Sequence, residues 1–246
     1  MKQTVFEIKE NIKIADSVYR MTLCGDTEGI RCGQFVNIKL DGLYLRRPIS
    51  VCDVEEDGTL VLIYKVVGKG TERMSGMTGG RLDILTQLGN GYDISRSGGK
   101  PLLIGGGVGV PPLYMLAKKL ISDGKNVTVI LGFNTKTEIF YENEFRAIGA
   151  SVYVATADGS YGTRGFVTDV LSELGSDFTY FYTCGPEPML RAVANATAFD
   201  GEMSFEERMG CGFGACMGCS CKTLAGNKRI CKDGPVMRKE EIIWNV

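Results

Sequence analysis

The sequence predicts a β + α/β protein: an N-terminal antiparallel β-barrel, then a doubly wound parallel sheet, then a small cysteine-rich C-terminal subdomain. Three observations indicate this order. The first hundred residues contain short runs of β-branched and aromatic residues, the next hundred alternate strand-like with helix-like segments, and five of the nine cysteines lie between positions 211 and 231. We therefore expect domains at residues 1–97, 98–200 and 201–246.

The N-terminal region is expected to form several short strands of a small barrel. Residues that favour strands are concentrated at 18–23, 34–40, 49–54 and 59–67. Glycine and aspartate turns separate these runs, and Asp57-Gly58 is typical of a β-hairpin turn. Residues 97–99, Ser-Gly-Gly, are a suitable linker to the next domain.

From Pro101 onward, strand-like segments alternate with helical ones. Strands are expected at 102–104, 127–131, 151–156 and 178–184, and helices at 113–121, 138–148, 166–174 and after residue 186. This alternation is typical of a parallel sheet with helices on both faces, which binds ligands beyond the carboxyl ends of its strands. Those ends lie at 105–110, 156–160 and 184–186, so we expect the three loops to form one cleft.

The loop at residues 105–112 reads G-G-G-V-G-V-P-P and comes directly before a predicted helix. Glycines permit the close approach of a phosphate, and the first N–H groups of a helix attract an anion. The same residues would also suit tight packing between strand and helix, because the register is not that of a strict G-x-G-x-x-G motif. The two neighbouring loops favour dinucleotide binding.

The C-terminal cysteines carry the strongest chemical signal. Cys211, Cys216, Cys219 and Cys231 read C-x4-C-x2-C-x11-C, and the first three match the plant-type spacing of [2Fe–2S] ligands. Glycines at 210, 212, 214 and 218 let backbone N–H groups approach the sulfurs. Such donors help to set the reduction potential of a cluster. The pattern therefore predicts an electron carrier.

Other interpretations of these cysteines remain open. Four thiolates would also hold a structural zinc ion, although zinc sites rarely begin with C-x4-C on a glycine-rich loop. A disulfide knot is disfavoured, because no export signal is recognised and the other cysteines are scattered at 24, 32, 52 and 184. Cys221 would share a strand face with Cys219, so it is either a spare ligand or a structural thiol.

The composition excludes several function classes. A net charge of −1 offers no electrostatic surface for nucleic acid, and glycines and prolines interrupt the apolar stretch 101–117 too often for a membrane helix. The absence of histidine excludes Rieske clusters, zinc proteases of the HExxH type and Ser-His catalysis. Hydride and electron transfer remain, because a cofactor carries that chemistry. We expect a cytoplasmic protein, which suits reduced thiols and an iron–sulfur cluster.

Arg46 and Arg47 precede a predicted strand in the run L-R-R-P-I-S, residues 45–50. Adjacent surface arginines are most often simply solvated. An arginine beside a strand end can also bind a phosphate through two parallel hydrogen bonds. The motif alone leaves this choice open.

Together these motifs resemble the ferredoxin–NAD(P) reductase superfamily. The runs that carry the resemblance are L-R-R-P-I-S at 45–50, G-G-G-V-G-V-P-P-L at 105–113, A-T-A-D-G-S-Y-G-T-R-G-F-V-T-D-V at 155–170, C-G-P-E-P-M-L at 184–190, E-E-R-M-G-C-G-F-G-A-C-M-G-C at 206–219 and C-K-D-G-P-V at 231–236. Within the superfamily, the chain is similar to the electron-transfer subunits of type 1B dihydroorotate dehydrogenase. The resemblance covers essentially the whole chain.

The resemblance implies an FAD site in the barrel. Arg47 would contact the FAD diphosphate, and Ser50 would lie near the reactive N5 of the flavin as a catalytic residue. Ile49 replaces the tyrosine usual at its position, which removes ring stacking there. The remaining implied FAD contacts are Pro48, Ile49, Ile63, Tyr64, Lys65, Gly70 and Thr71.

The resemblance also implies an NAD site in the sheet, with Cys184 near the nicotinamide as a catalytic residue. The implied contacts are Gly106, Gly107, Gly109, Asp158, Gly185 and Pro186. Asp158 stands where NADP-dependent relatives carry an arginine for the 2′-phosphate, so we expect NAD to be preferred, unless Lys136 or Arg164 supplies a cation. The implied cluster ligands are Cys211, Cys216, Cys219 and Cys231, with no role assigned to Cys221.

The implied function is electron transfer in pyrimidine (UMP) biosynthesis. Electrons from dihydroorotate would pass from an FMN-bearing catalytic subunit through the [2Fe–2S] cluster and FAD to NAD, in a heterotetramer of two copies of each chain. Met209, Phe213, Met217 and residues 235–237 would either dock this partner or merely shield the cluster. Three further functions stay open: a subunit of a sulfide dehydrogenase or of an electron-bifurcating ferredoxin–NAD(P) reductase, a free-standing NADH:acceptor reductase, and a zinc-stabilised redox-sensing module.

Overall fold

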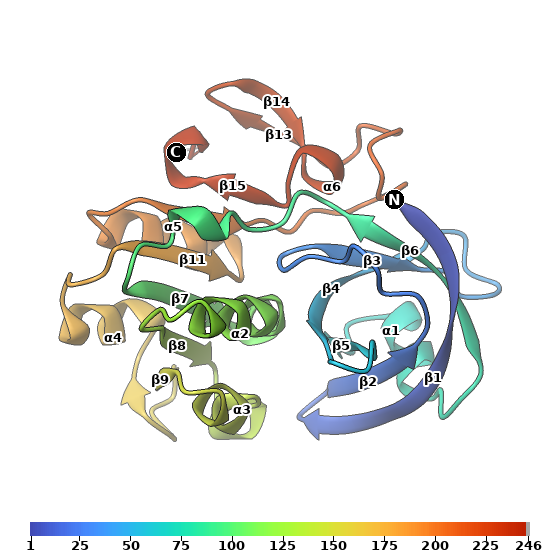
Figure 1. The fold of residues 1–246 in the computed structure, drawn as a ribbon, viewed down its shortest axis with the longest axis horizontal. Helices are drawn as coiled ribbons and strands as arrows, with labels where there is room; N and C mark the ends of the chain where they lie inside the picture. Colours follow the sequence, from blue (N-terminus) through green and yellow to red (C-terminus); the bar gives the residue numbers. More distant parts are fainter. Residues whose placement is uncertain (245–246) are drawn as a thin grey trace.

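The computed structural model describes residues 1–244 and places a closed β-barrel beside a seven-stranded sheet (Figure 1). The C-terminal segment lies across the barrel and the sheet, at the top of the view in Figure 1. This arrangement confirms the predicted fold class. None of the helices within residues 1–244 has the length and apolar character needed to cross a membrane.

The barrel closes through six antiparallel strands in the order β1-β2-β5-β4-β3-β6. Their bounds are β1 Lys2–Ala15, β2 Val18–Cys24, β3 Phe35–Ile38, β4 Arg47–Val54, β5 Leu60–Lys65 and β6 Arg81–Leu88. The four strands expected from the sequence are present, whereas β1 and β6 were not expected. Along β1 only Phe6 and Ile8 are buried, so charged residues conceal its strand pattern. The short helix α1, Lys69–Ser75, follows β5.

The sheet has the order β10-β9-β8-β7-β11-β12-β15, and all neighbours are parallel except β12 and β15. Its strands are β7 Pro101–Gly106, β8 Thr128–Phe133, β9 Ser151–Thr156, β10 Thr163–Arg164, β11 Tyr180–Cys184, β12 Gly201–Ser204 and β15 Val236–Arg238. The helices are α2 Tyr114–Ser122, α3 Glu142–Ala147, α4 Val167–Leu174 and α5 Glu187–Ala196. Short 3-10 turns occur at Ile94–Arg96, Gly107–Gly109, Pro111–Leu113, Lys136–Glu138 and Lys239–Glu241.

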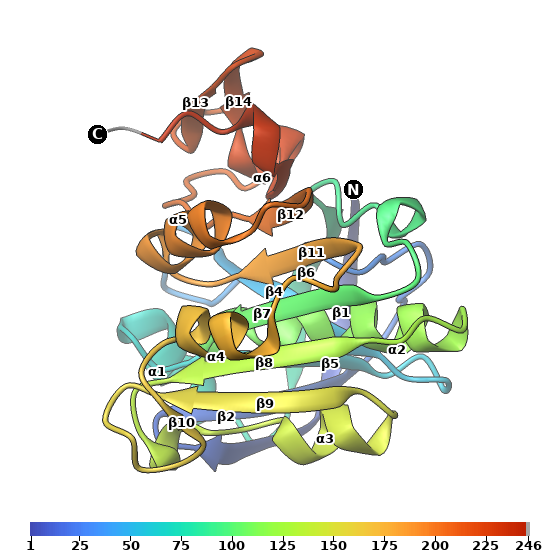
Figure 2. The ribbon, with the colours of Figure 1, turned by 90° about the vertical axis from the view of Figure 1, so that its left-hand side faces the viewer.

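The helices cover both faces of the sheet, as the sequence predicted (Figure 2). Helices α2 and α3 pack on the face toward the barrel, and α4 and α5 pack on the other face. From β7 the chain runs outward through β8 and β9, then returns to β11 on the opposite side of β7. The strand order therefore reverses between β7 and β11, which is where open α/β sheets bind ligands.

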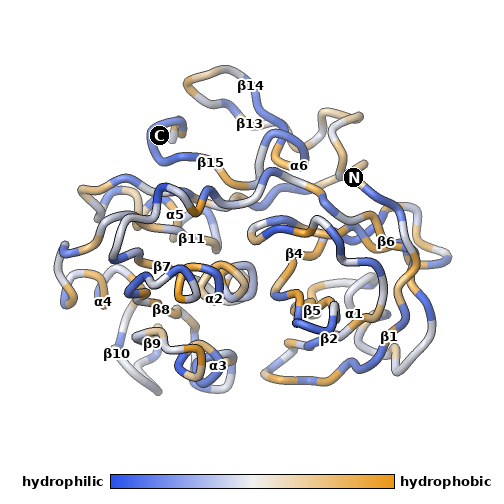
Figure 3. Tube along the Cα trace, in the orientation of Figure 1, coloured by the Kyte–Doolittle hydropathy of each residue, from blue (hydrophilic) through white to orange (hydrophobic). Residues whose placement is uncertain are grey.

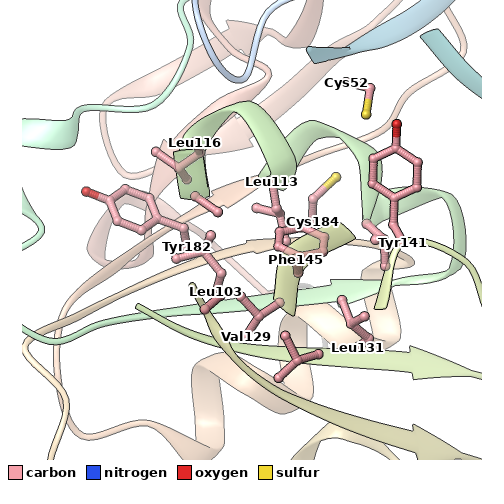
Figure 4. Close-up of a cluster of buried hydrophobic side chains, with 14 of the residues drawn as sticks. Cys52, Leu103, Leu113, Leu116, Val129, Leu131, Tyr141, Phe145, Tyr182 and Cys184 are labelled. Carbon is pink, nitrogen blue, oxygen red and sulfur yellow. The ribbon is translucent and has the colours of Figure 1, made fainter. Parts of the chain in front are cut away.

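The largest buried cluster joins the barrel to the sheet. Cys52 and Ile63 of the barrel belong to the same cluster as Leu113 and Leu116, at the start of α2 and within it. Figure 4 shows part of this cluster, and Figure 3 shows hydrophobic residues concentrated in β4, β5 and the central strands of the sheet. Because the two parts share a core, the barrel strands are held at a fixed position relative to the loops of the sheet.

The C-terminal segment consists of a hairpin, β13 Ser220–Thr223 and β14 Gly226–Arg229, followed by the short helix α6, Ile230–Asp233. Its core is formed with the barrel, because Phe35, Leu85 and Leu88 pack against Ile230 and Met237. Strands β12 and β15 belong to the large sheet, although both come after residue 200. The sheet therefore extends past the boundary expected at residues 200–201.

Residues 235–237, which were expected to dock a partner, lie inside the protein. Pro235 is buried, and Val236 and Met237 are only 4% and 2% exposed. Asn90, just after β6, donates from Nδ2 to the Val236 carbonyl at 2.7 Å and accepts the Val236 N–H at 3.1 Å. The docking prediction for these three residues is therefore wrong, because β15 pairs with β12 and completes the sheet.

Glu202 on β12 gives the protein a pH-dependent stability. Its side chain is buried and accepts the Asp93 N–H at 2.9 Å, and burial raises its pKa from 4.5 to about 7. The folded state therefore favours the neutral acid, and the stability that this confers is complete below pH 4.5 and lost as the pH rises through 7. We expect the free energy of unfolding to fall by at most about 3 kcal/mol between about pH 5 and about pH 8.

Urea denaturation of the wild type and of Glu202→Gln at both pH values checks this expectation. Glutamine keeps an acceptor for the Asp93 N–H but cannot ionise, so the variant should be more stable than the wild type at about pH 8. The two proteins should be nearly equal at about pH 5. An equal pH dependence in both proteins would contradict the assignment.

Candidate redox site

The three loops at the carboxyl ends of the strands line one cavity of about 580 Å³, as expected from the sequence. It lies where the strand order reverses, between the loop after β7 and the loop after β11. Gly109 makes their close approach possible, because a Cβ at this position would lie 2.2 Å from the Cys184 carbonyl oxygen. The predicted NAD contacts that line the cavity are Gly106, Gly107, Gly109, Gly185 and Pro186.

Asp158 is not among the lining residues of this cavity, although its neighbour Ala157 is. The Asp158 carboxylate accepts hydrogen bonds from the Ser160 hydroxyl at 2.6 Å and the Ser160 N–H at 2.9 Å. These bonds lower the pKa of Asp158 and keep it ionised. The Lys136 backbone N–H donates to the Ser160 hydroxyl oxygen at 2.8 Å, so this bond joins the loop after β8 to the loop after β9. The preference for NAD over NADP stays a prediction.

Among the lining residues that were not anticipated from the sequence, two stand out by their chemistry. Phe166, 69% exposed, stands at the start of α4, and Glu206 follows β12 on the way to the cysteine loop. The sequence pattern marks Phe166 only as the first residue of a helix. An exposed aromatic residue beside a ligand cavity could offer a flat surface to a ring, and this exposure cannot be derived from sequence.

Cys184 lies at the end of β11 with its side chain in the core shared by barrel and sheet. Figure 4 shows it beside Leu113 and Phe145. Burial raises the pKa of its thiol to about 12, with a further contribution from Glu206, so this sulfur is a neutral thiol at neutral pH. The side chain is not part of the cavity lining, which places the Cys184 sulfur on the barrel side of the loop.

The two arginines of the L-R-R-P-I-S run have different environments. Arg46 is held by the barrel, because its Nη1 and Nη2 atoms both donate to Asp83 Oδ1 at 3.0 Å and Nη1 also reaches the Asp83 carbonyl. Arg47 binds only the carbonyls of Leu45 and Arg46, and it forms no ion pair within residues 1–244. The motif alone could not separate these two roles, whereas the family resemblance selected Arg47.

Arg47 is in direct contact with the start of α1. A Cβ on Gly70 would lie 1.9 Å from the Nε atom of Arg47, so only glycine fits at this position. The turn before α1 is held by Thr71, whose Oγ1 accepts the Val67 N–H at 2.9 Å and the Gly68 N–H at 3.3 Å. Arg47, Gly70 and Thr71, three of the predicted FAD contacts, therefore lie together.

The other predicted FAD contacts are distributed along β4 and β5. Pro48, Ile49 and Ser50 are half-buried in β4. Ile63 and Tyr64 have buried side chains, and the Tyr64 hydroxyl donates to Asn11 Oδ1 at 3.0 Å, so both residues offer a ligand only their backbone.

Lys65, at the end of β5, pairs with Glu138 of the sheet domain at 3.1 Å, and both residues line the 580 Å³ cavity. This ion pair connects the barrel to the dinucleotide cleft. The predicted FAD and NAD contacts therefore meet at Lys65.

The predicted cluster cysteines lie on the loop before β13 and at α6, and they associate in two pairs. The Cys211 sulfur accepts the N–H groups of Ala215 at 3.2 Å and Cys216 at 3.4 Å, together with the Cys216 thiol. Cys231 donates its N–H to the Cys219 sulfur at 3.4 Å and its thiol to the same atom. The pairs are therefore Cys211 with Cys216 and Cys219 with Cys231.

Hydrogen bonding and burial have opposite effects on the pKa of Cys211. Burial alone raises the pKa of Cys211, but the N–H groups of Cys216, Phe213 and Ala215 outweigh it and hold the pKa at about 6. Burial and the neighbouring Cys219 raise the pKa of Cys231 to about 12. The loop therefore favours a thiolate at Cys211 without any metal, as a ligand site requires.

The geometry of the cysteines bears on the possibility of a zinc site. A zinc ion takes four ligands on one centre, whereas a [2Fe–2S] cluster distributes four thiolates over two irons. The paired arrangement fits the second case. Cys221 lies within β13, half-buried against the C-terminal core, and belongs to neither pair.

Comparison with known proteins agrees with this geometry. Residues 206–243 match the family described as the iron-sulfur cluster binding domain of dihydroorotate dehydrogenase B, and residues 103–195 match the oxidoreductase NAD-binding domain. A solved structure of NADH-dependent reduced ferredoxin-NADP oxidoreductase, a flavin-based electron-bifurcating enzyme, covers 97% of this chain and 90% of its own, with 34% identity and a TM-score of 0.89. A ferredoxin NADP+ reductase from Neisseria gonorrhoeae covers 80% of this chain and 90% of its own; at 16% identity and a TM-score of 0.69, it shows the fold alone.

The barrel, the cleft of the sheet and the cysteine loop define an NAD-linked oxidoreductase of the ferredoxin reductase type with an added iron–sulfur domain. The electron transfer subunits of dihydroorotate dehydrogenase B (NAD+) from Fusobacterium nucleatum and Geobacillus thermodenitrificans are 45% and 46% identical to this chain; the first match covers 96% of both chains and the second 94%. The chain belongs to the family of dihydroorotate dehydrogenase B electron transfer subunits.

Proposed function

We propose that this chain carries electrons to NAD+ from an FMN-bearing catalytic subunit that oxidises dihydroorotate to orotate, in pyrimidine biosynthesis. The cofactors are a [2Fe–2S] cluster, which exchanges single electrons, and FAD, which exchanges either single electrons or a hydride. The observation that carries the proposal is the seating of the cysteine segment on the barrel and against the sheet, which brings all three predicted cofactor regions together on one chain.

In the barrel, Arg47 and the start of α1 would hold the FAD diphosphate. The guanidinium packed on Gly70 and the first backbone N–H groups of α1 form a cationic cradle that a Cβ on Gly70 would fill. Ser50 would supply a hydroxyl to the flavin, and the backbone of Ile63 and Tyr64 would supply its N–H and C=O groups. The ion pair of Lys65 with Glu138 orients the lysine at the border between the FAD and NAD sites.

In the sheet, the loops of Gly106–Gly109 and Gly185–Pro186 would hold the NAD diphosphate and nicotinamide ribose. Gly107 has a positive φ of 52° and open space where its Cβ would be, which leaves room for a ligand to approach the backbone. Cys184, kept neutral by burial, would limit the space behind the nicotinamide without acting as a nucleophile. Phe166 would cover one side of the cleft.

In the C-terminal segment, Cys211 and Cys216 would bind one iron, and Cys219 and Cys231 the other. This division is supported by the hydrogen bonds that join each pair, from the Cys216 N–H to the Cys211 sulfur and from the Cys231 N–H to the Cys219 sulfur. Cys216 is the exposed member, whereas Cys219 and Cys231 are buried beneath the barrel contact. The Cys211–Cys216 side therefore faces outward, toward a second protein.

Exposed apolar side chains lie on the cysteine loop and at the tip of the following hairpin. Phe213, Met217 and Leu224 are 44%, 54% and 73% exposed, and Leu224 lies at the turn between β13 and β14. Flexible and aromatic apolar residues of this kind are common in protein interfaces. We propose that this surface docks the catalytic subunit, with two copies of each chain in the complex.

Reconstitution tests the proposed function. The purified chain alone should reduce a dye with NADH but show no dihydroorotate:NAD+ activity, because in this proposal dihydroorotate binds to the catalytic subunit. Addition of an FMN-bearing dihydroorotate dehydrogenase subunit should create that activity and form a complex on gel filtration. Dihydroorotate turnover by the isolated chain, or no complex, would contradict the proposal.

The second candidate is a subunit of an electron-bifurcating ferredoxin–NAD(P) reductase. The similarity to such an enzyme, 34% identity over 97% of this chain, favours it over a sulfide dehydrogenase subunit, a free-standing reductase or a zinc-stabilised module. The same gel filtration discriminates the two candidates: binding to a bifurcating partner subunit but not to the dihydroorotate dehydrogenase subunit would replace the first function by the second.

A further inference from the structure

Asn37 on β3 lies between the strand of the predicted FAD site and the cysteine loop. In the ladder between β3 and β4, Asn37 pairs with Pro48. Phe35, two residues earlier on β3, pairs with Ser50. The side chain is only 1% exposed. Asn37 therefore belongs to the buried part of the barrel, where a polar residue requires a reason.

The Asn37 amide is in direct contact with the cysteine loop. Its Nδ2 donates to the Cys211 carbonyl oxygen at 3.2 Å. The next residue, Gly212, has a φ of 77°, and a Cβ there would lie 2.2 Å from the same Nδ2 atom. The backbone at the first predicted iron ligand therefore rests on the Asn37 amide, and glycine is needed for this approach.

The rest of the Asn37 side chain is not stabilised in the same way. Its Oδ1 atom is buried and has no hydrogen-bond partner in the described structure. A buried polar atom left without a partner lowers stability, and an apolar side chain of the same shape would avoid that cost. Folding of the barrel alone would therefore favour leucine over asparagine here. The hydrogen bond to Cys211 is the contact that leucine could not make.

The peptide that Asn37 holds controls the geometry of the loop. The Cys211 sulfur accepts the N–H groups of Ala215 and Cys216, so the Cys211 backbone and the turn to Cys216 form one unit. Displacement of the Cys211 carbonyl would move this unit relative to β3 and β4. Residues behind metal ligands commonly fix their orientation in this manner.

We propose that Asn37 is a positioning residue that sets the place of the iron–sulfur loop relative to the flavin strand β4. The proposal rests on the proposed function, since it assumes that Cys211 binds the cluster and that β4 borders the FAD. It goes beyond that function, because it assigns the relative position of the cluster loop and the FAD site to the side-chain amide of Asn37. Its role is in electron transfer, not in the stability of the fold.

The test compares Asn37→Leu with the matched control Gln34→Met, both in the complete cofactor-loaded protein. Gln34 is a second buried carboxamide of the barrel, but both of its ends are paired, with the Gly89 carbonyl and the Arg31 N–H, each at 3.0 Å. Three quantities are measured: the melting temperature, the EPR spectrum and reduction potential of the cluster, and the rate at which NADH reduces the cluster.

For Asn37→Leu we expect an unchanged or higher melting temperature, an altered EPR spectrum and potential, and cluster reduction slower by about tenfold. For Gln34→Met we expect a lower melting temperature with an unaltered cluster. A lower melting temperature for Asn37→Leu with an unaltered spectrum and potential would overturn the proposal, as would no change in any quantity. If the leucine variant does not fold, Asn37→Ala, which cannot crowd the loop, is judged by the same spectrum and potential.

This outcome is separable from failure of the proposed function. If the wild-type protein lacks flavin and iron–sulfur absorption bands, the proposed function fails before any variant is compared. If the bands are present but the Asn37 variants behave like the wild type, the positioning role is disproved and the proposed function is unaffected.

Discussion

Cys219→Ser is expected to lose nearly all cluster iron and sulfide, whereas Cys221→Ser should retain both. The spacing of plant-type ligands selects Cys219, because it follows Cys216 by an x2 interval. The structure gives an independent reason. Cys219 is 2% exposed and accepts both the N–H and the thiol of Cys231, so the two sulfurs already lie together. Serine would remove one thiolate of the four that hold a [2Fe–2S] cluster.

Cys221 is the matched control for this experiment, because it is only two residues away and packs against the same buried cluster. It lies on β13, half-buried against the core beneath the loop, and burial raises its pKa. Iron and acid-labile sulfide are measured in anaerobically purified protein, with the visible spectrum as a second measure. Retention of iron in Cys219→Ser together with its loss in Cys221→Ser would transfer the ligand role to Cys221.

Arg47→Ala is expected to weaken FAD binding by on the order of 2 kcal/mol, about thirtyfold, while the protein keeps its fold. The guanidinium packs on Gly70 at the start of α1 and has no carboxylate partner within residues 1–244, so its charge is available to an anion. A hydrogen bond to a charged group is worth more than a neutral one, and an arginine can form two with a diphosphate. Titration of the apoprotein with FAD, followed by flavin fluorescence, measures the loss.

The neighbouring arginine supplies the matched control. Arg46→Ala should destabilise the barrel by about 1–3 kcal/mol, since it removes the hydrogen bonds that Arg46 donates to the half-buried Asp83 carboxylate and to the Asp83 and Asn37 carbonyls. Its FAD affinity should remain close to that of the wild type. If Arg46→Ala lost FAD and Arg47→Ala did not, the assignment of the diphosphate to Arg47 would be reversed.

Much of the fold could be predicted because local patterns and tertiary packing agree. Four strands of the sheet, β7, β8, β9 and β11, were predicted, and the interval expected at 151–156 coincides with β9. Strands β1 and β6 escaped prediction. In β1 most residues face water, so its pairing with β2 and β6 is decided by ladder hydrogen bonds and not by an apolar pattern. Strands β12 and β15 are too short to show any period and form only because the sheet offers them an edge.

In the candidate site, too, some features could be predicted from local sequence and others depend on tertiary packing. The cysteine spacing and the glycine loop are local features, and their chemistry could be inferred from the residues alone. The motif alone did not show which of two adjacent arginines is available to a ligand, and only the family resemblance selected Arg47, because Asp83, the partner of Arg46, is 37 residues away. The exposure of Phe166 and the burial of residues 235–237 likewise depend on which distant elements cover them.

The sequence by itself determined the chemical identity of this protein: an electron carrier with a four-cysteine cluster motif, a dinucleotide loop and no histidine for acid–base catalysis. These are properties of residue type and short spacing, which the chain fixes before it folds. The tertiary structure decided how the parts are coupled. The contact of Asn37 with Cys211 spans 174 residues, and the strand order that opens the cleft between β7 and β11 exists only in the assembled sheet. Side-chain packing selects such contacts among many that the sequence alone would permit.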